Sequence, residues 1–227
     1  MIIDKEQLRA NLDELIWNIE EARIRVSEHH IVKLVTVAKY TEIENIQTLY
    51  ALGQRAFGEN QVQQLKERMT QLEALPLEWH MIGSVQKNKI NNLIDLRPTL
   101  MHSLDSLDLA EELNKKLETK NSKMSCLLQI NAANEASKSG VSVEKALDIY
   151  QEINERFPNI TLKGVMTIGA HTEDKKLIQQ SFETTQSMYE KLEKDGATIC
   201  SMGMSSDYAL AIQCGSNLVR VGSALFK

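Results

Sequence analysis

The stretch TLKGVMTIGAHTEDKKLIQQSFETTQSMYEKLEKDGATICSMG (161–203) contains the pattern that decides the fold. It opens with a largely apolar run at 161–169, continues with a helical pattern over 173–193 and ends with a second apolar run at 197–203. Short apolar runs separated by an amphipathic helix are typical of a βαβ unit, in which two strands pair in parallel. Both faces of such a sheet are covered, so its strands are apolar throughout. The stretch therefore predicts a parallel sheet with helices outside.

The same alternation extends along the chain on both sides of this stretch. Further strand candidates lie at 33–39, 55–60, 78–83, 99–105, 123–131 and 217–226. Helical patterns separate them, no clear helix follows the last one, and an amphipathic helix within 1–30 precedes the first. Eight such strands predict a (β/α)8 barrel, with a doubly wound open sheet as the alternative. We expect one domain, with the N-terminal helix in 1–30 and the barrel in 33–227.

The composition of the 227 residues excludes several classes of protein. The chain is 42% hydrophobic and 25% charged, its net charge is −5, and it has no basic block, which argues against a nucleic-acid or membrane-surface protein. No apolar run approaches the roughly 18 residues of a membrane helix. The three cysteines have no CxxC spacing, which predicts reduced thiols and no zinc site. We expect a cytoplasmic protein without a metal. The apolar stripe of the first helix should pack on the barrel, which favours a monomer.

The end of the first strand candidate places a lysine where a barrel has its active site. Active sites of (β/α)8 barrels lie at the C-terminal ends of the strands. Lys39 closes the first apolar run. A lysine with a desolvated stem has a lowered pKa, and its amine can attack an aldehyde to form a Schiff base. The alternative is an ordinary surface lysine at a strand end.

Two loops near the C-terminus predict a phosphate site. Phosphate often binds after strands seven and eight of such a barrel. The loop SMGMSSD (201–207) combines small hydroxyl residues and a glycine directly before a helix, and such a loop can present N–H groups to an anion. In the eighth strand, Arg220 adds a fixed charge, Gly222 permits close backbone approach and Ser223 adds a hydroxyl. Each loop alone also fits a helix cap or a tight bend, but together with Lys39 they favour a ligand site.

Other polar residues near strand ends allow two interpretations each. Asn60 can hydrogen-bond a ligand or cap the next helix, and Lys138 can face a ligand or be a solvated loop charge. Met166 is expected to pack over whatever fills the barrel mouth. His80 and His102 lie inside apolar runs, where a histidine is more often a satisfied core residue than a ligand or base.

At these residues the sequence resembles the pyridoxal phosphate homeostasis proteins, a family similar to the N-terminal barrel of alanine racemase. The matching segments run in family order over nearly the whole chain: LVTVAK (34–39), FGEN (57–60), WHMIGSVQKNK (79–89), HSLD (102–105), QINAANEASKSG (129–140), GVMTIG (164–169) and the residues 201–226. The resemblance implies a (β/α)8 barrel that holds pyridoxal 5'-phosphate (PLP) as an aldimine on Lys39.

The resemblance also implies a set of cofactor-binding residues. Phosphate contacts are implied for Ser201, Ser205, Gly222 and Ser223, a place beside the pyridine nitrogen for Arg220, and a place in the pocket wall for Asn60, Lys138 and Met166. A cation at the pyridine nitrogen keeps that nitrogen unprotonated, which weakens the ring as an electron sink. The chain departs from the family at Ala38 and Tyr40, because Ser-Lys-Thr usually surrounds the lysine. This departure removes the serine and threonine hydroxyl groups from the expected pocket wall beside Lys39, and it leaves the lysine itself in place.

The function implied by the resemblance is that of a PLP carrier or buffer without catalytic residues. Alanine racemases use a second, β-rich domain that supplies a tyrosine acid/base, and this chain has no residues left to build one. Enzymes that lack PLP are the implied recipients. Two alternatives stay open. One is a PLP-dependent enzyme of the amino-acid racemase type, and the other is a PLP-free barrel enzyme that uses Lys39 and the phosphate loops on a sugar phosphate.

Overall fold

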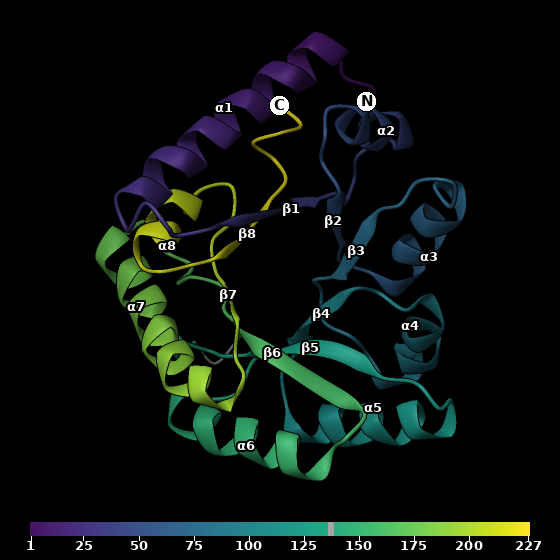
Figure 1. Cartoon of the computed structure of the whole chain (residues 1–227), viewed down its shortest axis with the longest axis vertical. Helices are drawn as coiled ribbons and strands as arrows, with labels where there is room; N and C mark the ends of the chain where they lie inside the picture. Colours follow the sequence, from purple (N-terminus) through teal and green to yellow (C-terminus); the bar gives the residue numbers. More distant parts are fainter. Residues whose placement is uncertain (136–138) are drawn as a thin grey trace.

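The computed structural model describes residues 1–135 and 139–227, and its centre is a closed barrel of parallel strands (Figure 1). The strands follow one another around the barrel in sequence order: β1 (Lys33–Val37), β2 (Ala56–Glu59), β3 (Glu78–Met81), β4 (Leu100–Leu104), β5 (Met124–Gln129), β6 (Ile160–Met166), β7 (Ile199–Ser201) and β8 (Leu218–Val221). Pairing of β1 with β8 closes the barrel. The predicted (β/α)8 barrel is confirmed, and the open sheet is wrong.

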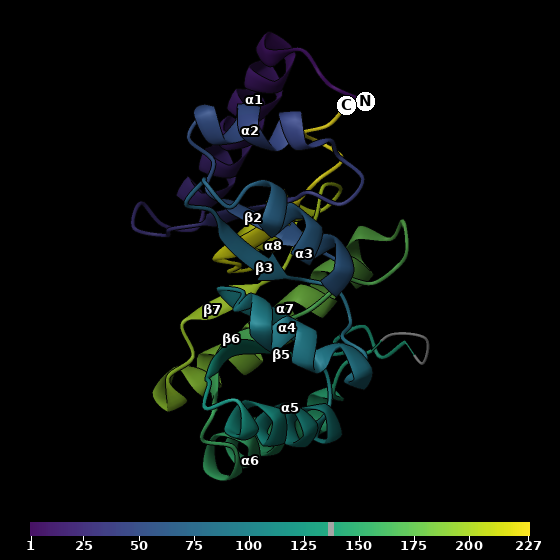
Figure 2. The same ribbon diagram turned by 90° about the vertical axis from the view of Figure 1, so that its right-hand side faces the viewer.

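The helices form a ring around the barrel, as Figures 1 and 2 show from two directions. They are α1 (Lys5–Ile24), α2 (Ile43–Ala51), α3 (Val62–Gln71), α4 (Ile90–Leu96), α5 (Leu107–Thr119), α6 (Ala146–Arg156), α7 (Lys175–Leu192) and α8 (Tyr208–Gln213). Most carry an apolar face that packs on the strands. No helix in the described part of the chain is long and apolar enough to cross a membrane.

Strand register decides which side chains face the barrel interior. Val35 of β1 pairs with Arg220 of β8, and Thr36 pairs with Val221, so these two pairs lie on opposite faces of the sheet. The inner face carries a compact apolar cluster drawn from six strands: Val35, Ala56, Leu100, Leu127, Met166 and Leu218. Arg220 is therefore an inward residue above an apolar floor.

Helix α1 lies in the outer ring between α8 and α2. Its apolar stripe is buried, and the helix contacts α8 on one side and α2 on the other. The strand predicted to reach 226 ends at Val221, because the chain turns and the Leu225 N–H donates to the Gly222 carbonyl oxygen. Asn11 of α1 donates to the Leu225 carbonyl oxygen, which holds this turn against the helix. The N-terminal helix thus completes the outer ring.

The two tryptophans of the chain have opposite surroundings. Trp79 of β3 is buried, and its ring centroid lies 5.9 Å from that of Phe57 on β2. Trp17 lies on the outer face of α1 and is 67% exposed. Two further apolar residues of this helix, Ile16 and Ile24, are also exposed. The sequence pattern indicated only the buried stripe of α1.

We expect Gly164→Ala to destabilise the barrel by about 2–4 kcal/mol, because φ strain and overpacking add. Gly164 lies in β6 with φ +142°, and a Cβ there would lie 1.9 Å from the Ile199 carbonyl oxygen of β7. Gly53→Ala is the matched control, since Gly53 has φ +106° but no atom within 4 Å of its Cβ position. Chemical denaturation of both variants measures the difference. Equal losses of stability would contradict the steric argument.

Candidate functional site

A cavity of about 270 Å³ lies at the carboxyl ends of β1 and β8, which are neighbours in the barrel. This volume is close to the lower end of the range for small-molecule sites. The lining residues come from the two strand ends and the segments that follow them: Val37, Lys39, Tyr40, Thr41, Gly222, Ser223 and Phe226. The structure therefore brings together three of the predicted site residues, Lys39, Gly222 and Ser223.

Lys39 lies in a tight turn that directly follows β1. The Thr41 N–H donates to the Ala38 carbonyl oxygen at 3.1 Å, so Lys39 and Tyr40 are the two central residues of the turn. Tyr40 has φ +67°, a left-handed conformation that costs a non-glycine residue about 1–2 kcal/mol. The Lys39 side chain is exposed rather than desolvated, with Nζ 5.7 Å from the centre of the exposed Tyr40 ring. Its amine is therefore accessible at the mouth.

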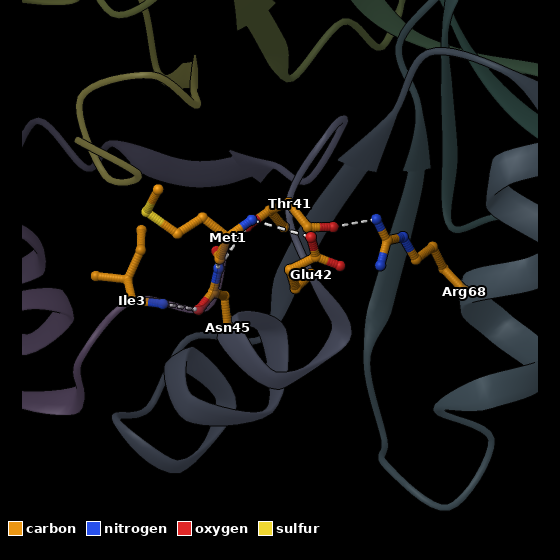
Figure 3. Close-up of polar contacts among 6 residues, drawn as sticks. All are labelled: Met1, Ile3, Thr41, Glu42, Asn45 and Arg68. Carbon is orange, nitrogen blue, oxygen red and sulfur yellow. Dashed lines mark hydrogen bonds and ion pairs between the residues drawn. The ribbon is translucent and has the colours of Figure 1, made fainter.

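A polar network holds the far side of this turn (Figure 3). Asn45 of α2 donates to the Thr41 hydroxyl at 2.9 Å and to the Met1 carbonyl oxygen at 3.0 Å, and its own oxygen accepts the Ile3 N–H. The Met1 amine pairs with Glu42. The N-terminal residues are thus attached to the segment that follows Lys39.

An ion pair between half-buried Arg68 and buried Glu59 supports the same turn. Arg68 of α3 donates to the Thr41 carbonyl oxygen, and its Nε lies 3.5 Å from Oε1 of Glu59, which is fully buried at the end of β2 (Figure 3 draws the Arg68 contact with Thr41). Burial raises the pKa of Glu59 to about 7, although the positive charge of Arg68 opposes the rise. Helix α3 therefore holds the lysine turn through one guanidinium.

The segment after β8 presents backbone N–H groups that converge on one oxygen. The Gly222 and Ala224 N–H groups both donate to the Ser205 hydroxyl, at 3.2 and 3.4 Å. Converging N–H groups of this kind can bind an anion. Helix α8, which follows Ser205, has six residues, so its dipole adds little. The converging amides found near strands seven and eight thus belong to the segment after β8.

Arg220 is buried within the barrel and bonded along one side of its guanidinium. Nη1 donates to the carbonyl oxygen and hydroxyl of Ser201, at 3.0 and 2.5 Å, and Nη2 donates to the Thr167 carbonyl oxygen at 2.9 Å. Burial lowers the pKa of Arg220 to about 10, so the side chain stays charged at neutral pH, and Asp207 opposes the shift. Ser201 is itself fully buried, and its hydroxyl contacts Arg220 and His102.

The two histidines expected in the core are indeed buried, and they contact each other. Nδ1 of His80 lies 2.9 Å from Nε2 of His102. Burial lowers the pKa of His80 to about 4 and that of His102 well below its ordinary value. Both rings are therefore neutral at pH 7. The sequence pattern did not indicate this contact, because the two residues lie on different strands.

The remaining predicted residues have separate positions. Met166 belongs to the inner apolar cluster, and Asn60 follows β2, where its carbonyl oxygen packs against Gly83. Lys138 lies outside the described residues. Among the residues that the structure describes, no three His, Cys, Asp or Glu side chains gather as a metal site. An exposed amine at the cavity and converging amide donors beside it, with a buried cation inside the barrel, suit a small ligand that carries an aldehyde and an anionic group.

The chain is similar to proteins of known family. The family model described as alanine racemase, N-terminal domain, matches residues 10–227. A protein of Helicobacter pylori named pyridoxal phosphate homeostasis protein is 54% identical over 219 residues, which is 96% of this chain and 98% of that one. A human protein of the same name is 34% identical and covers 86% of this chain and 75% of its own.

Solved structures of similar proteins match in fold as well. PipY of Synechococcus elongatus PCC7942, solved with PLP bound, is 28% identical, has a TM-score of 0.81 and covers 97% of this chain and 100% of its own. Alanine racemase of Clostridium difficile 630 is 20% identical with a TM-score of 0.76, covers 97% of this chain and 56% of its own, and bears on the fold alone.

Proposed function

Because the chain belongs to the alanine racemase N-terminal domain family, and within it to the pyridoxal phosphate homeostasis proteins, we propose that it binds PLP at the mouth of its barrel and takes part in PLP homeostasis. The relatives bear the name of that role, and the related PipY was solved with PLP bound. The observation within this chain that carries the proposal is the cavity that Lys39 shares with Gly222 and Ser223. It places an amine and a phosphate-type loop within one small space.

The residues of the mouth fit the chemical groups of PLP. The aldehyde of PLP can condense with an amine and release water, and the accessible amine of Lys39 is the one in the cavity. The Gly222 and Ala224 N–H groups, together with the Ser205 and Ser223 hydroxyls, would receive the phosphate, and Arg220 would face the pyridine nitrogen. We assign the covalent attachment to Lys39, and Asn60, Lys138, Met166 and Ser201 remain predicted members of the pocket wall.

We assign no catalytic residue, and the chain acts in this proposal as a carrier or buffer. The charge of Arg220 persists at neutral pH, and a cation facing the pyridine nitrogen keeps that nitrogen unprotonated. The bound cofactor is then a poor electron sink for amino-acid chemistry. Recipients of the cofactor are enzymes that lack PLP. We further propose a monomer in the cytoplasm, where free thiols such as the buried Cys126 and Cys200 stay reduced.

An absorption spectrum of the purified protein with added PLP tests the proposal. We expect an imine band that borohydride removes and a reduced adduct that maps to one lysine peptide. A protein that stays colourless would overturn the proposal and favour the PLP-free barrel enzyme. Turnover of amino acids by the loaded protein would favour the racemase-type enzyme. Mixing loaded protein with a PLP-free enzyme, and following recovery of that enzyme's activity, tests delivery.

We expect Ser223→Ala to weaken PLP binding about tenfold or more, because a hydrogen bond to a charged group contributes roughly 1.5–3 kcal/mol. Ser223 lines the cavity from the segment after β8. Ser206→Ala is the control, since Ser206 is exposed but does not line this cavity. Equilibrium titration of both variants measures the affinities. Unchanged affinity of Ser223→Ala would remove the hydroxyl from the proposed phosphate contacts.

A further inference from the structure

A continuous chain of polar side chains crosses the barrel interior beneath the mouth. It runs from His80 on β3 to His102 on β4, then to Ser201 on β7 and Arg220 on β8. The contacts are 2.9 Å between the histidine rings, 3.3 Å from Nδ1 of His102 to the Ser201 hydroxyl, and 2.5 Å from that hydroxyl to Nη1 of Arg220. All four side chains are at least 96% buried. Such a chain must have its donors and acceptors in a consistent order.

The arginine fixes that order, because a guanidinium only donates. The Ser201 oxygen accepts from Arg220, and in the described part of the chain Nδ1 of His102 is the acceptor within reach of the hydroxyl hydrogen; if Nδ1 donated instead, this buried hydrogen would have no acceptor. A neutral His102 that accepts at Nδ1 carries its proton on Nε2 and donates to Nδ1 of His80. His80, neutral as well, then carries its proton on Nε2. The geometry therefore specifies the tautomers of both rings.

We propose that His102 is a positioning residue, which acts through the Ser201 hydroxyl to hold the Arg220 guanidinium in the orientation that faces PLP. The proposal rests on the proposed function, because it concerns the same mouth. Three of the hydrogen bonds of Arg220 go to Ser201 and Thr167, which leaves Nε and one Nη2 hydrogen to face the ligand. Without His102 the Ser201 hydroxyl loses the partner opposite Arg220, so the serine side chain can turn to another rotamer and release one of the three hydrogen bonds that hold the guanidinium.

The tautomers provide a test in the cofactor-free protein. We expect long-range 1H–15N spectra of histidine-labelled protein to place the proton of both His80 and His102 on Nε2. A proton on Nδ1 of either ring would reverse the chain and overturn the proposal. This result is independent of PLP, so it separates a failure of this inference from a failure of the proposed function.

A set of variants tests the positioning role itself. In His102→Leu we expect the Arg220 Nε–H to exchange faster with water and PLP to bind about five- to tenfold more weakly, as expected for the loss of one supporting hydrogen bond. His102→Gln should restore part of both properties, since its amide can accept from Ser201 and donate to His80. Met101→Leu is the control, because Met101 is equally buried beside His102 but faces the helices.

Two outcomes would overturn the positioning role. One is a His102→Leu protein whose Arg220 exchange and PLP affinity equal those of Met101→Leu. The other is a His102→Gln protein that folds and binds no better than His102→Leu. If His102→Leu does not fold, the glutamine variant and the wild-type tautomers still decide the question.

Discussion

Replacing Lys39 by alanine is expected to abolish the borohydride-reducible attachment of PLP, while the barrel stays folded. The stability should change by less than about 0.5 kcal/mol, because Lys39 is exposed and touches mainly the exposed Tyr40 ring. The amide and hydroxyl donors of the phosphate site are intact in this variant, so PLP is expected to bind without a covalent bond. Mass spectrometry after reduction measures the adduct, and calorimetry measures residual binding.

The control for this experiment lies at the other end of the same strand. Lys33 begins β1 and pairs with Glu78, on the face of the barrel opposite the mouth. Lys33→Ala should therefore keep a full adduct. An adduct that persists in Lys39→Ala would show that another lysine carries the cofactor, and Lys138 would be the next candidate.

Removing Arg68 is expected to lower the stability of the barrel by an amount that depends on pH. Arg68→Met leaves the fully buried Glu59 carboxyl without its cation, which should cost about 1–1.5 kcal/mol at pH 8, because a carboxyl with a folded-state pKa of about 7 can take up a proton instead of staying charged. The variant also loses the contact with the Thr41 carbonyl oxygen that supports the lysine turn. Chemical denaturation at pH 8 measures the loss. Arg9→Met is the control, because Arg9 is an exposed arginine of α1.

The effect of Arg68→Met should grow with pH. Burial raises the folded-state pKa of Glu59 from 4.5 to about 7, so stability from its protonation is fully present below about pH 4.5 and is lost as the pH rises through 7. The charge of Arg68 favours the ionised carboxylate, and so it limits the loss of stability at high pH. Arg68→Met lacks this charge, so its loss of stability should be larger at pH 8 than at pH 5. The double variant Glu59→Gln/Arg68→Met should recover most of the stability at pH 8. A loss that is the same at pH 5 and pH 8 would contradict the buried-charge argument.

Apolar strand runs and the positions of their ends made the architecture predictable. Lys39, Gly222 and Ser223 follow from the rule that a barrel binds ligands at its strand ends, and the structure places all three on one cavity. The end of the last strand was not predictable, because the run 217–226 stays apolar through the turn that begins at Gly222. Periodicity describes which face a residue occupies, and it says little about where pairing stops.

The polar contacts that support the site could not be predicted from the sequence, for a different reason. Ser201 and His102 are 99 positions apart, and Arg68 reaches Thr41 from another helix. Such pairs depend on the register and closure of the barrel, which a single sequence does not specify. The sequence pattern around a histidine in an apolar strand is the same whether or not that histidine contacts a second one. The left-handed conformation of Tyr40 could not be predicted either, since glycine or asparagine is the usual residue at such a turn position.

The contrast between Trp17 and Trp79 gives the molecule two optical reporters that can be separated. The indole of Trp17 is 67% exposed on α1, so iodide should quench its fluorescence, whereas that of Trp79, 5% exposed against Phe57, should be protected and emit at shorter wavelength. With Trp17 silenced by quencher or replaced by phenylalanine, the remaining emission comes from the wall of the barrel alone. Energy transfer from that indole to a chromophore at the mouth would then report occupancy in real time, without any added label.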